Sequence, residues 1–142
     1  MSHKCKNGLV TCMDFRLYPE VFSWMERENI LGDSDFLGTP AGASMCLLNN
    51  KSPEAKMLIN QIEASIKLHN LETVILLHHS QCGAYGLAYN FSTSEEEKAK
   101  QFEDMNNSRK IILDKFPQLK VRLVWAELLD DCGKKIIFED VE

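Results

Sequence analysis

The sequence predicts an α/β protein, a single domain over residues 1–142 with a mainly parallel central β-sheet flanked by helices. Short apolar runs, "GLVTC", "TVILLHH" and "VRLVWAELL", alternate with segments of helical periodicity. The second run is continuously apolar, which is typical of a strand covered on both faces and therefore of a parallel sheet. A chain of 142 residues is also long enough to bury one core without disulfide staples.

Two helices before the middle strand are indicated by their end signals. Ser52 is a suitable N-cap, Pro53 suits the first helical position, and Asn70 suits a left-handed cap at the other end. A shorter helix is expected to begin at Pro19. An irregular segment lies between the two predicted helices. The resulting order of strands and helices is that of an α/β layout with crossover connections.

A third helix and a strand-rich end follow the middle strand. Ser94 and Glu97 have the spacing of a capping box, and Pro117 stops the apolar pattern that comes after them. After Val121, two apolar runs flank the turn-like "DDCG", which predicts a hairpin or a strand with a terminal extension.

Composition narrows the classes of function. The chain has 21 acidic and 16 basic residues, a formal net charge of −5, which argues against nucleic-acid binding. It contains no run approaching the roughly 18 apolar residues that span a bilayer, so no membrane association is expected. The start "MSHKCKNGLVTC" lacks the apolar core of a secretory signal, which predicts a cytoplasmic protein whose five cysteines are mostly reduced.

Two cysteine motifs follow two predicted strands. Cys12 ends the first apolar run, and "HHSQCGAYG" follows the second. If the strands are neighbours, Cys12, His79 and Cys82 converge at the carboxyl end of the sheet, and two thiolates with an imidazole suit Zn²⁺. His78 is the rival ligand, but it should point to the other side of the strand as a packed or hydrogen-bonded residue.

The other cysteines and histidines lack a comparable motif. We expect them to be structural or incidental: Cys5, Cys46, Cys132, His3 and His69. A phosphatase loop is disfavoured, because Arg16 follows Cys12 by four residues where that loop needs six. "GTPAGAS" lacks the lysine of a nucleotide-binding P-loop.

"CMDFR" followed by "HSQCG" resembles the Cys-x-Asp-x-Arg and His-x-x-Cys motifs of the β-class carbonic anhydrases. The resemblance implies a parallel-sheet α/β fold and a zinc ion held by Cys12, His79 and Cys82. It also implies a catalytic pair, Asp14 and Arg16. Physically, a bidentate pair with Arg16 would keep Asp14 ionised and away from the metal, free to accept a hydrogen bond from zinc-bound water.

The resemblance implies zinc-dependent, reversible hydration of carbon dioxide to bicarbonate by a zinc-bound hydroxide, in a homodimer or higher homo-oligomer. Two alternatives stay open: a related zinc hydrolase of carbonyl sulfide or carbon disulfide, and a non-catalytic zinc protein in which Asp14 is the fourth ligand. The chain departs from the family at "GTPAGA", where an Arg-Asn pair is usual, and at Phe15, where a small residue is usual. The lining near Phe15, Phe36 and Tyr85 would bear on the choice of substrate.

Overall fold

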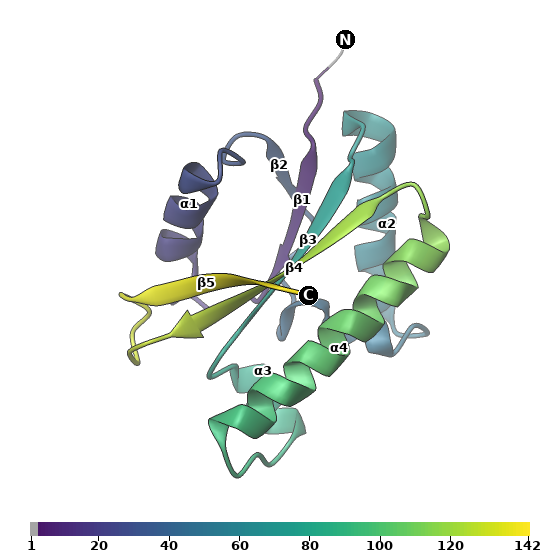
Figure 1. Cartoon of the computed structure of the whole chain (residues 1–142). Helices are drawn as coiled ribbons and strands as arrows, with labels where there is room; N and C mark the ends of the chain where they lie inside the picture. Colours follow the sequence, from purple (N-terminus) through teal and green to yellow (C-terminus); the bar gives the residue numbers. More distant parts are fainter. Residues whose placement is uncertain (1–2) are drawn as a thin grey trace.

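A five-stranded sheet forms the centre of the molecule in the computed structural model, which describes residues 3–142 (Figure 1). Its spatial order is β2-β1-β3-β4-β5, and all neighbours are parallel except β4 and β5. The strands are β1 (Asn7–Thr11), β2 (Ser34–Phe36), β3 (Thr73–His79), β4 (Lys120–Leu128) and β5 (Ile136–Val141). The predicted α/β class with a mainly parallel sheet is confirmed.

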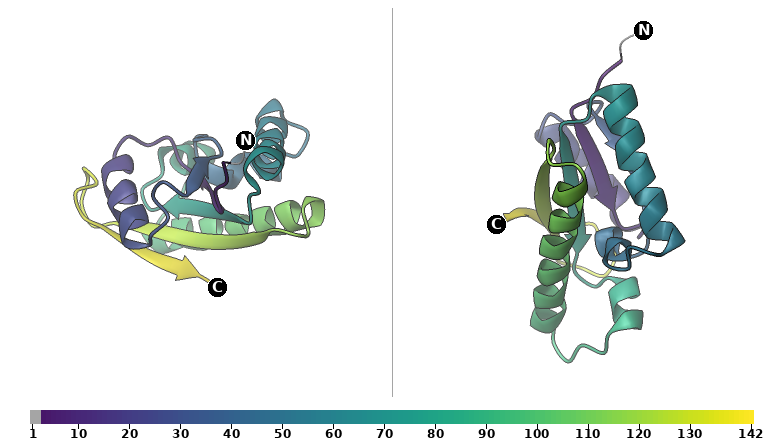
Figure 2. Two further views of the ribbon diagram at one scale, coloured as in Figure 1. Left: turned by 90° about the horizontal axis from the view of Figure 1, so that it is seen from above. Right: turned by 90° about the vertical axis from the view of Figure 1, so that its right-hand side faces the viewer.

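Helices cover both faces of this sheet (Figure 2). They are α1 (Tyr18–Arg27), α2 (Pro53–His69), α3 (Gly83–Ala88) and α4 (Ser94–Lys115), with a 3₁₀ helix η1 at Ala43–Leu48. Buried side chains of α1 pack on one face, and those of α2 and α4 pack on the other. No helix in the described part of the chain is long and apolar enough to cross a membrane.

The buried strand β3 serves both cores because successive side chains point to opposite faces. Ile75 and Leu77 belong to the core under α1, whereas Val74 and Leu76 belong to the core under α2 and α4. Every residue of β3 after Thr73 is buried. This explains the continuously apolar run in the sequence.

The ends of α2 match the predicted signals. Ser52 is the N-cap and its side chain accepts a hydrogen bond from the backbone N–H of Ala55 at 3.1 Å. Asn70 ends the helix in the left-handed conformation, with φ of 59°. The helix that was expected to begin at Pro19 is α1, which begins one residue earlier at Tyr18.

The expected capping box of α4 is wrong by one residue. Thr93 is the N-cap, and its hydroxyl accepts a hydrogen bond from the backbone N–H of Glu96 at 3.2 Å. The shift leaves the Glu97 carboxylate free to bond elsewhere. Three short elements were also not expected, namely β2, η1 and α3, because segments of three to six residues carry little periodic signal.

The carboxyl-terminal hairpin is confirmed. β4 and β5 pair antiparallel, with Leu128 opposite Ile136 at the turn. The Asp130 side chain organises the connecting loop by accepting hydrogen bonds from the backbone N–H groups of Cys132, Lys134 and Lys135 at 3.0–3.1 Å. This loop lies at the carboxyl end of the parallel strands.

Candidate metal centre

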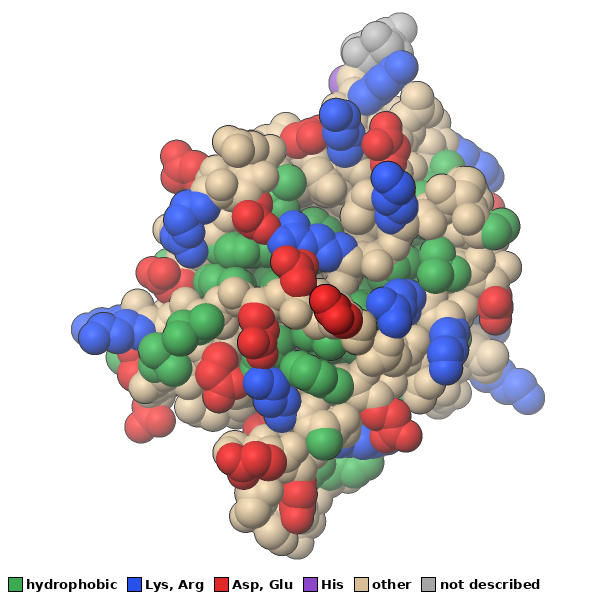
Figure 3. All heavy atoms as spheres, viewed as in Figure 1, with side chains coloured by type: hydrophobic (Ala, Val, Ile, Leu, Met, Phe, Trp, Pro, Cys, Tyr) green, Lys and Arg blue, Asp and Glu red, His purple; other side chains and the backbone are tan. Residues whose placement is uncertain are grey.

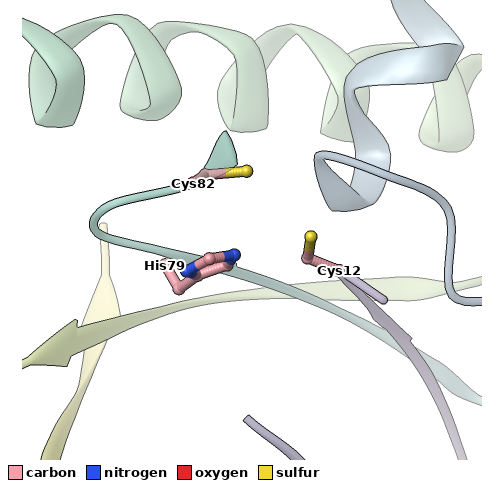
Figure 4. Close-up of side chains that lie close together, drawn as sticks. All are labelled: Cys12, His79 and Cys82. Carbon is pink, nitrogen blue, oxygen red and sulfur yellow. The ribbon is translucent and has the colours of Figure 1, made fainter. Parts of the chain in front are cut away.

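Cys12, His79 and Cys82 meet at the carboxyl ends of β1 and β3 (Figure 4). The two strands are parallel neighbours, and Thr11 pairs with Leu77, so Cys12 and His79 leave the same edge of the sheet. Cys82 precedes the first residue of α3. All three residues are buried, and their donor atoms lie within 4.8 Å of one another.

The ring of His79 is oriented for a metal. Its Nδ1 lies 2.7 Å from the backbone oxygen of Ser80, so this nitrogen carries the proton and donates it. Its Nε2 is buried and has no hydrogen-bond partner among the described residues. An unpaired buried nitrogen facing two thiols is costly unless it accepts a proton or coordinates a cation.

The two thiols ionise unequally. The pKa of Cys12 is lowered, chiefly by the hydrogen bond from the Cys82 thiol and further by His79 and by a backbone N–H. That N–H belongs to Gly42, whose nitrogen lies 3.4 Å from Cys12 Sγ. The pKa of Cys82 is raised because it donates to Cys12 and is buried.

These donors fit a zinc ion. Two thiolates and one imidazole form a recurrent protein donor set for tetrahedral Zn²⁺, which leaves one position for another ligand. The bare Nε2 of His79 supports this fit, since it has the lone pair that coordination needs.

Asp14 and Arg16 form a tight pair beside the cluster. Arg16 Nη2 donates to Asp14 Oδ2 at 2.6 Å, while Arg16 Nε and the backbone N–H of Arg16 both donate to Oδ1 at 3.0 Å. Each side chain is only 14% exposed, so this is not a solvated surface pair. The hydrogen bonds from Arg16 lower the pKa of Asp14, and Asp14 Oδ2 lies 4.0 Å from His79 Nε2.

Arg16 also holds the loop between His79 and Cys82. Its Nη2 donates to the backbone oxygen of Gln81 at 2.9 Å, and its Nη1 donates to Gln81 Oε1 at 3.2 Å. Gln81 has a φ of 57°, which a residue with a side chain adopts at some cost. One guanidinium thus links the aspartate to the loop that carries two of the three donors.

Sequence reasoning missed Glu97, whose carboxylate supports the same loop from α4. Glu97 Oε1 accepts from the backbone N–H of Cys82 and from Gln101 Nε2, both at 2.9 Å, and Oε2 accepts from the backbone N–H of Gln81 at 3.2 Å. Gln101 Nε2 also donates to the backbone oxygen of His79 at 2.8 Å. The only sequence signal, the spacing from Ser94, had suggested a helix cap instead.

His78 points away from the cluster, as predicted. Its Nδ1 lies 3.0 Å from Gln101 Oε1, and its Nε2 lies 2.7 Å from Ser44 Oγ. Gln101 donates through its amide nitrogen elsewhere, so its oxygen accepts from Nδ1 and the Ser44 hydroxyl donates to Nε2. Burial lowers the pKa of His78 to about 4, which keeps the ring neutral in this network.

A small cavity of about 180 Å³ opens beside Cys12 and Asp14. Its apolar lining includes Val21, Phe22 and Phe36. Of the three aromatic residues considered for substrate choice, only Phe36 lines it. Phe15 is 79% exposed, and Tyr85 is fully buried with its hydroxyl donating to Asp104 at 2.8 Å.

A second cluster of metal-ligating side chains was not expected from the sequence. Cys5, Asp35 and His69 place their donor atoms within 4.8 Å of one another. The sequence predicted Cys5 and His69 to be structural or incidental, and the structure brings both of them together with Asp35. The short strand β2, which supplies Asp35, gives no clear sequence pattern.

The fold and the cluster together define an α/β protein of the β-carbonic anhydrase type. Tetrameric β-carbonic anhydrases of Sordaria macrospora align over 99% of this chain and 82% of theirs, with a TM-score of 0.65 and 13% identity. A Coccomyxa β-carbonic anhydrase solved with acetazolamide aligns over 99% of this chain and 73% of its own, with a TM-score of 0.66 and 13% identity. At such identities the likeness establishes the fold.

The family follows from the sequence match. The profile of a family described as "Putative carbonic anhydrase" matches residues 2–133, and the chain belongs to this family. An uncharacterized protein of Rickettsia bellii is 40% identical over 117 residues, which are 80% of this chain and 71% of that protein. An uncharacterized protein of Rickettsia conorii is 37% identical over 117 residues, which are 80% of this chain and 62% of that protein.

Proposed function

We propose that the protein catalyses the reversible hydration of carbon dioxide to bicarbonate at a zinc ion held by Cys12, His79 and Cys82. The observation that carries the proposal is the buried Nε2 of His79, which has no hydrogen-bond partner in residues 3–142 and faces two thiols next to the Asp14–Arg16 pair. A zinc ion bound there would supply Lewis-acid activation of a water molecule.

Asp14 would orient that water. Its carboxylate is ionised and its two oxygens are fixed by Arg16, so it can accept a hydrogen bond while staying off the metal. A closed, non-catalytic site would require Asp14 to leave these hydrogen bonds, which argues for the open arrangement. The apolar cavity beside Cys12 suits a small, uncharged substrate such as carbon dioxide.

The thiolates set the expected pH range. Cys12 and Cys82 would offset the two positive charges of the ion, so the activated water should be less acidic than in a three-histidine site. Hydration activity should therefore rise toward alkaline pH.

Stopped-flow measurement of carbon dioxide hydration tests the proposal. The zinc-loaded protein should accelerate hydration, and Cys82→Ser should lose the zinc at this site and the acceleration, because a hydroxyl is a poor ligand in place of a thiolate. Cys132→Ser, in the exposed hairpin loop, is the matched control and should keep both.

Substrate choice is decided in the same assay series. Turnover of carbonyl sulfide or carbon disulfide without carbon dioxide hydration would replace the proposed substrate. Zinc-loaded protein inactive on all three compounds from neutral to alkaline pH would reject catalysis.

We also propose a homodimer in the cytoplasm, built over the cavity. Five large apolar side chains near the cluster are substantially exposed: Met13, Phe15, Tyr18, Phe22 and Phe36. A second copy of the chain would cover this apolar surface and close the cavity. Light scattering should give twice the monomer mass at micromolar concentration, and a monomer would contradict the proposal.

The charge distribution supports a small-molecule substrate. Acidic and basic side chains are interspersed over the face drawn in Figure 3, and the net charge of the chain is −5. Neither feature favours binding to a phosphate backbone.

A further inference from the structure

We propose that Cys5, Asp35 and His69 form a second transition-metal site, suited to Zn²⁺, at the opposite end of the sheet from the first cluster. Cys5 lies two residues before β1, Asp35 lies in the middle of β2, and His69 is the last residue of α2. Their donor atoms lie mutually within 4.8 Å. The proposal does not depend on the function proposed above.

The backbone fixes the segments that carry these donors. The N–H of Cys5 donates to the backbone oxygen of His69 at 3.0 Å, which joins the start of the chain to the end of α2. The backbone N–H of Lys6 donates to Asp33 Oδ1 at 2.9 Å. The backbone N–H of Asn7 donates to the backbone oxygen of Asp33 at 3.2 Å. The donors are therefore presented by paired backbone rather than by a flexible loop.

The side chains need little movement to coordinate an ion. His69 Nδ1 lies 2.6 Å from Asp35 Oδ2. Ligands of a tetrahedral zinc ion lie about 3.3–3.8 Å apart, from bond lengths of about 2.0–2.3 Å. If the distance between His69 Nδ1 and Asp35 Oδ2 increased by roughly 1 Å, a zinc ion could take the place of the hydrogen that the two atoms share. The buried Ser65 hydroxyl also donates to Asp35 Oδ2, which orients the carboxylate.

The chemistry and access of the cluster favour zinc. Sulfur, imidazole nitrogen and carboxylate oxygen are all zinc ligands, and a thiolate with a carboxylate would balance the charge of the ion. The cluster borders an open cavity of about 210 Å³, so an ion can enter from solvent. His3 lines the same cavity, and its ring centroid lies 4.9 Å from that of His69, which makes it a candidate for a fourth ligand.

A purely structural role predicts something different. Asp35 and His69 could form an ion pair that ties α2 to β2, and such a pair does not need the Cys5 thiol. A metal site does need the thiol. The effect of Cys5 on zinc content therefore separates the two roles.

The experiment is zinc saturation of the 142-residue chain, removal of free ion, and metal analysis by mass spectrometry. Cys5→Ser and His69→Gln should each hold one zinc equivalent fewer than the wild type. Cys46→Ser, another partly buried thiol, is the matched control and should hold the wild-type amount. Equal zinc content in Cys5→Ser, His69→Gln and Cys46→Ser would overturn the second site.

Alkylation of the unaltered chain gives an answer that does not depend on how the variants fold. Saturating Zn²⁺ should slow the modification of Cys5 at least tenfold, as mapped by peptide mass spectrometry, while exposed Cys132 reacts as before. Equal rates at Cys5 with and without Zn²⁺ would reject the site. Failure of the first cluster would look different, because Cys82→Ser would then leave the zinc content unchanged.

Discussion

Replacement of Glu97 by alanine should weaken zinc binding without removing a ligand. Glu97 receives the N–H groups of Gln81 and Cys82 and the amide of Gln101, so its loss frees the loop that carries two donors. Loss of a group that orients a metal ligand typically lowers affinity 10–100-fold, or about 1.4–2.7 kcal/mol. The hydrogen bonds of Glu97 to Cys82 and Gln101 are partly buried, whereas its bond to Gln81 is exposed. Loss of the two partly buried bonds should lower the free energy of unfolding by about 2–4 kcal/mol.

Competition with a chromogenic chelator measures the affinity, and urea unfolding measures the stability. Glu97→Gln should lose less, because its amide oxygen can still accept from Cys82 and Gln101. Glu95→Ala removes an exposed carboxylate from the same helical turn and should leave zinc affinity unchanged. A zinc dissociation constant in Glu97→Ala within twofold of wild type would refute the positioning role.

Two further predictions concern residues around the cluster. Arg16→Ala should keep zinc but abolish hydration, because Asp14 loses the partner that holds it off the metal; a zinc-edge absorption spectrum that retains an unchanged coordination shell would contradict this. Gly133→Ala should destabilise the fold by roughly 2 kcal/mol or more in urea unfolding, because φ is +73° and the new Cβ would lie 2.3 Å from the backbone oxygen of Arg16. Gly32→Ala is the control, since φ is +82° there but no atom lies within 4 Å of the new Cβ. Equal losses in the two glycine variants would show that the close approach to Arg16 costs nothing.

The parallel sheet and the convergence of Cys12, His79 and Cys82 could be predicted because they follow from topology. Neighbouring parallel strands end at the same edge, so motifs at two strand ends meet whatever their separation in sequence. Strand alternation also predicted that His78 points to the opposite side, where the structure places it with Ser44. These inferences need only the period and the order of the elements.

The supporting side chains could not be predicted because they depend on packing register. The N-cap of α4 is Thr93, one residue before the predicted Ser94, so Glu97 does not cap the helix. Its carboxylate instead accepts a hydrogen bond from the backbone N–H of Cys82. The cluster of Cys5, Asp35 and His69 depends on β2, a three-residue strand whose register no periodic pattern reveals. Contacts of this kind are fixed only when the helices have packed on the sheet.

Anomalous diffraction at the zinc edge, from crystals of the purified protein, tests the central claim most directly. The account predicts a zinc peak bonded to Cys12 Sγ, His79 Nε2 and Cys82 Sγ, with Asp14 still paired to Arg16 and away from the ion. Crystals grown with zinc that show no peak between these three residues, or show Asp14 as the fourth ligand, would contradict it.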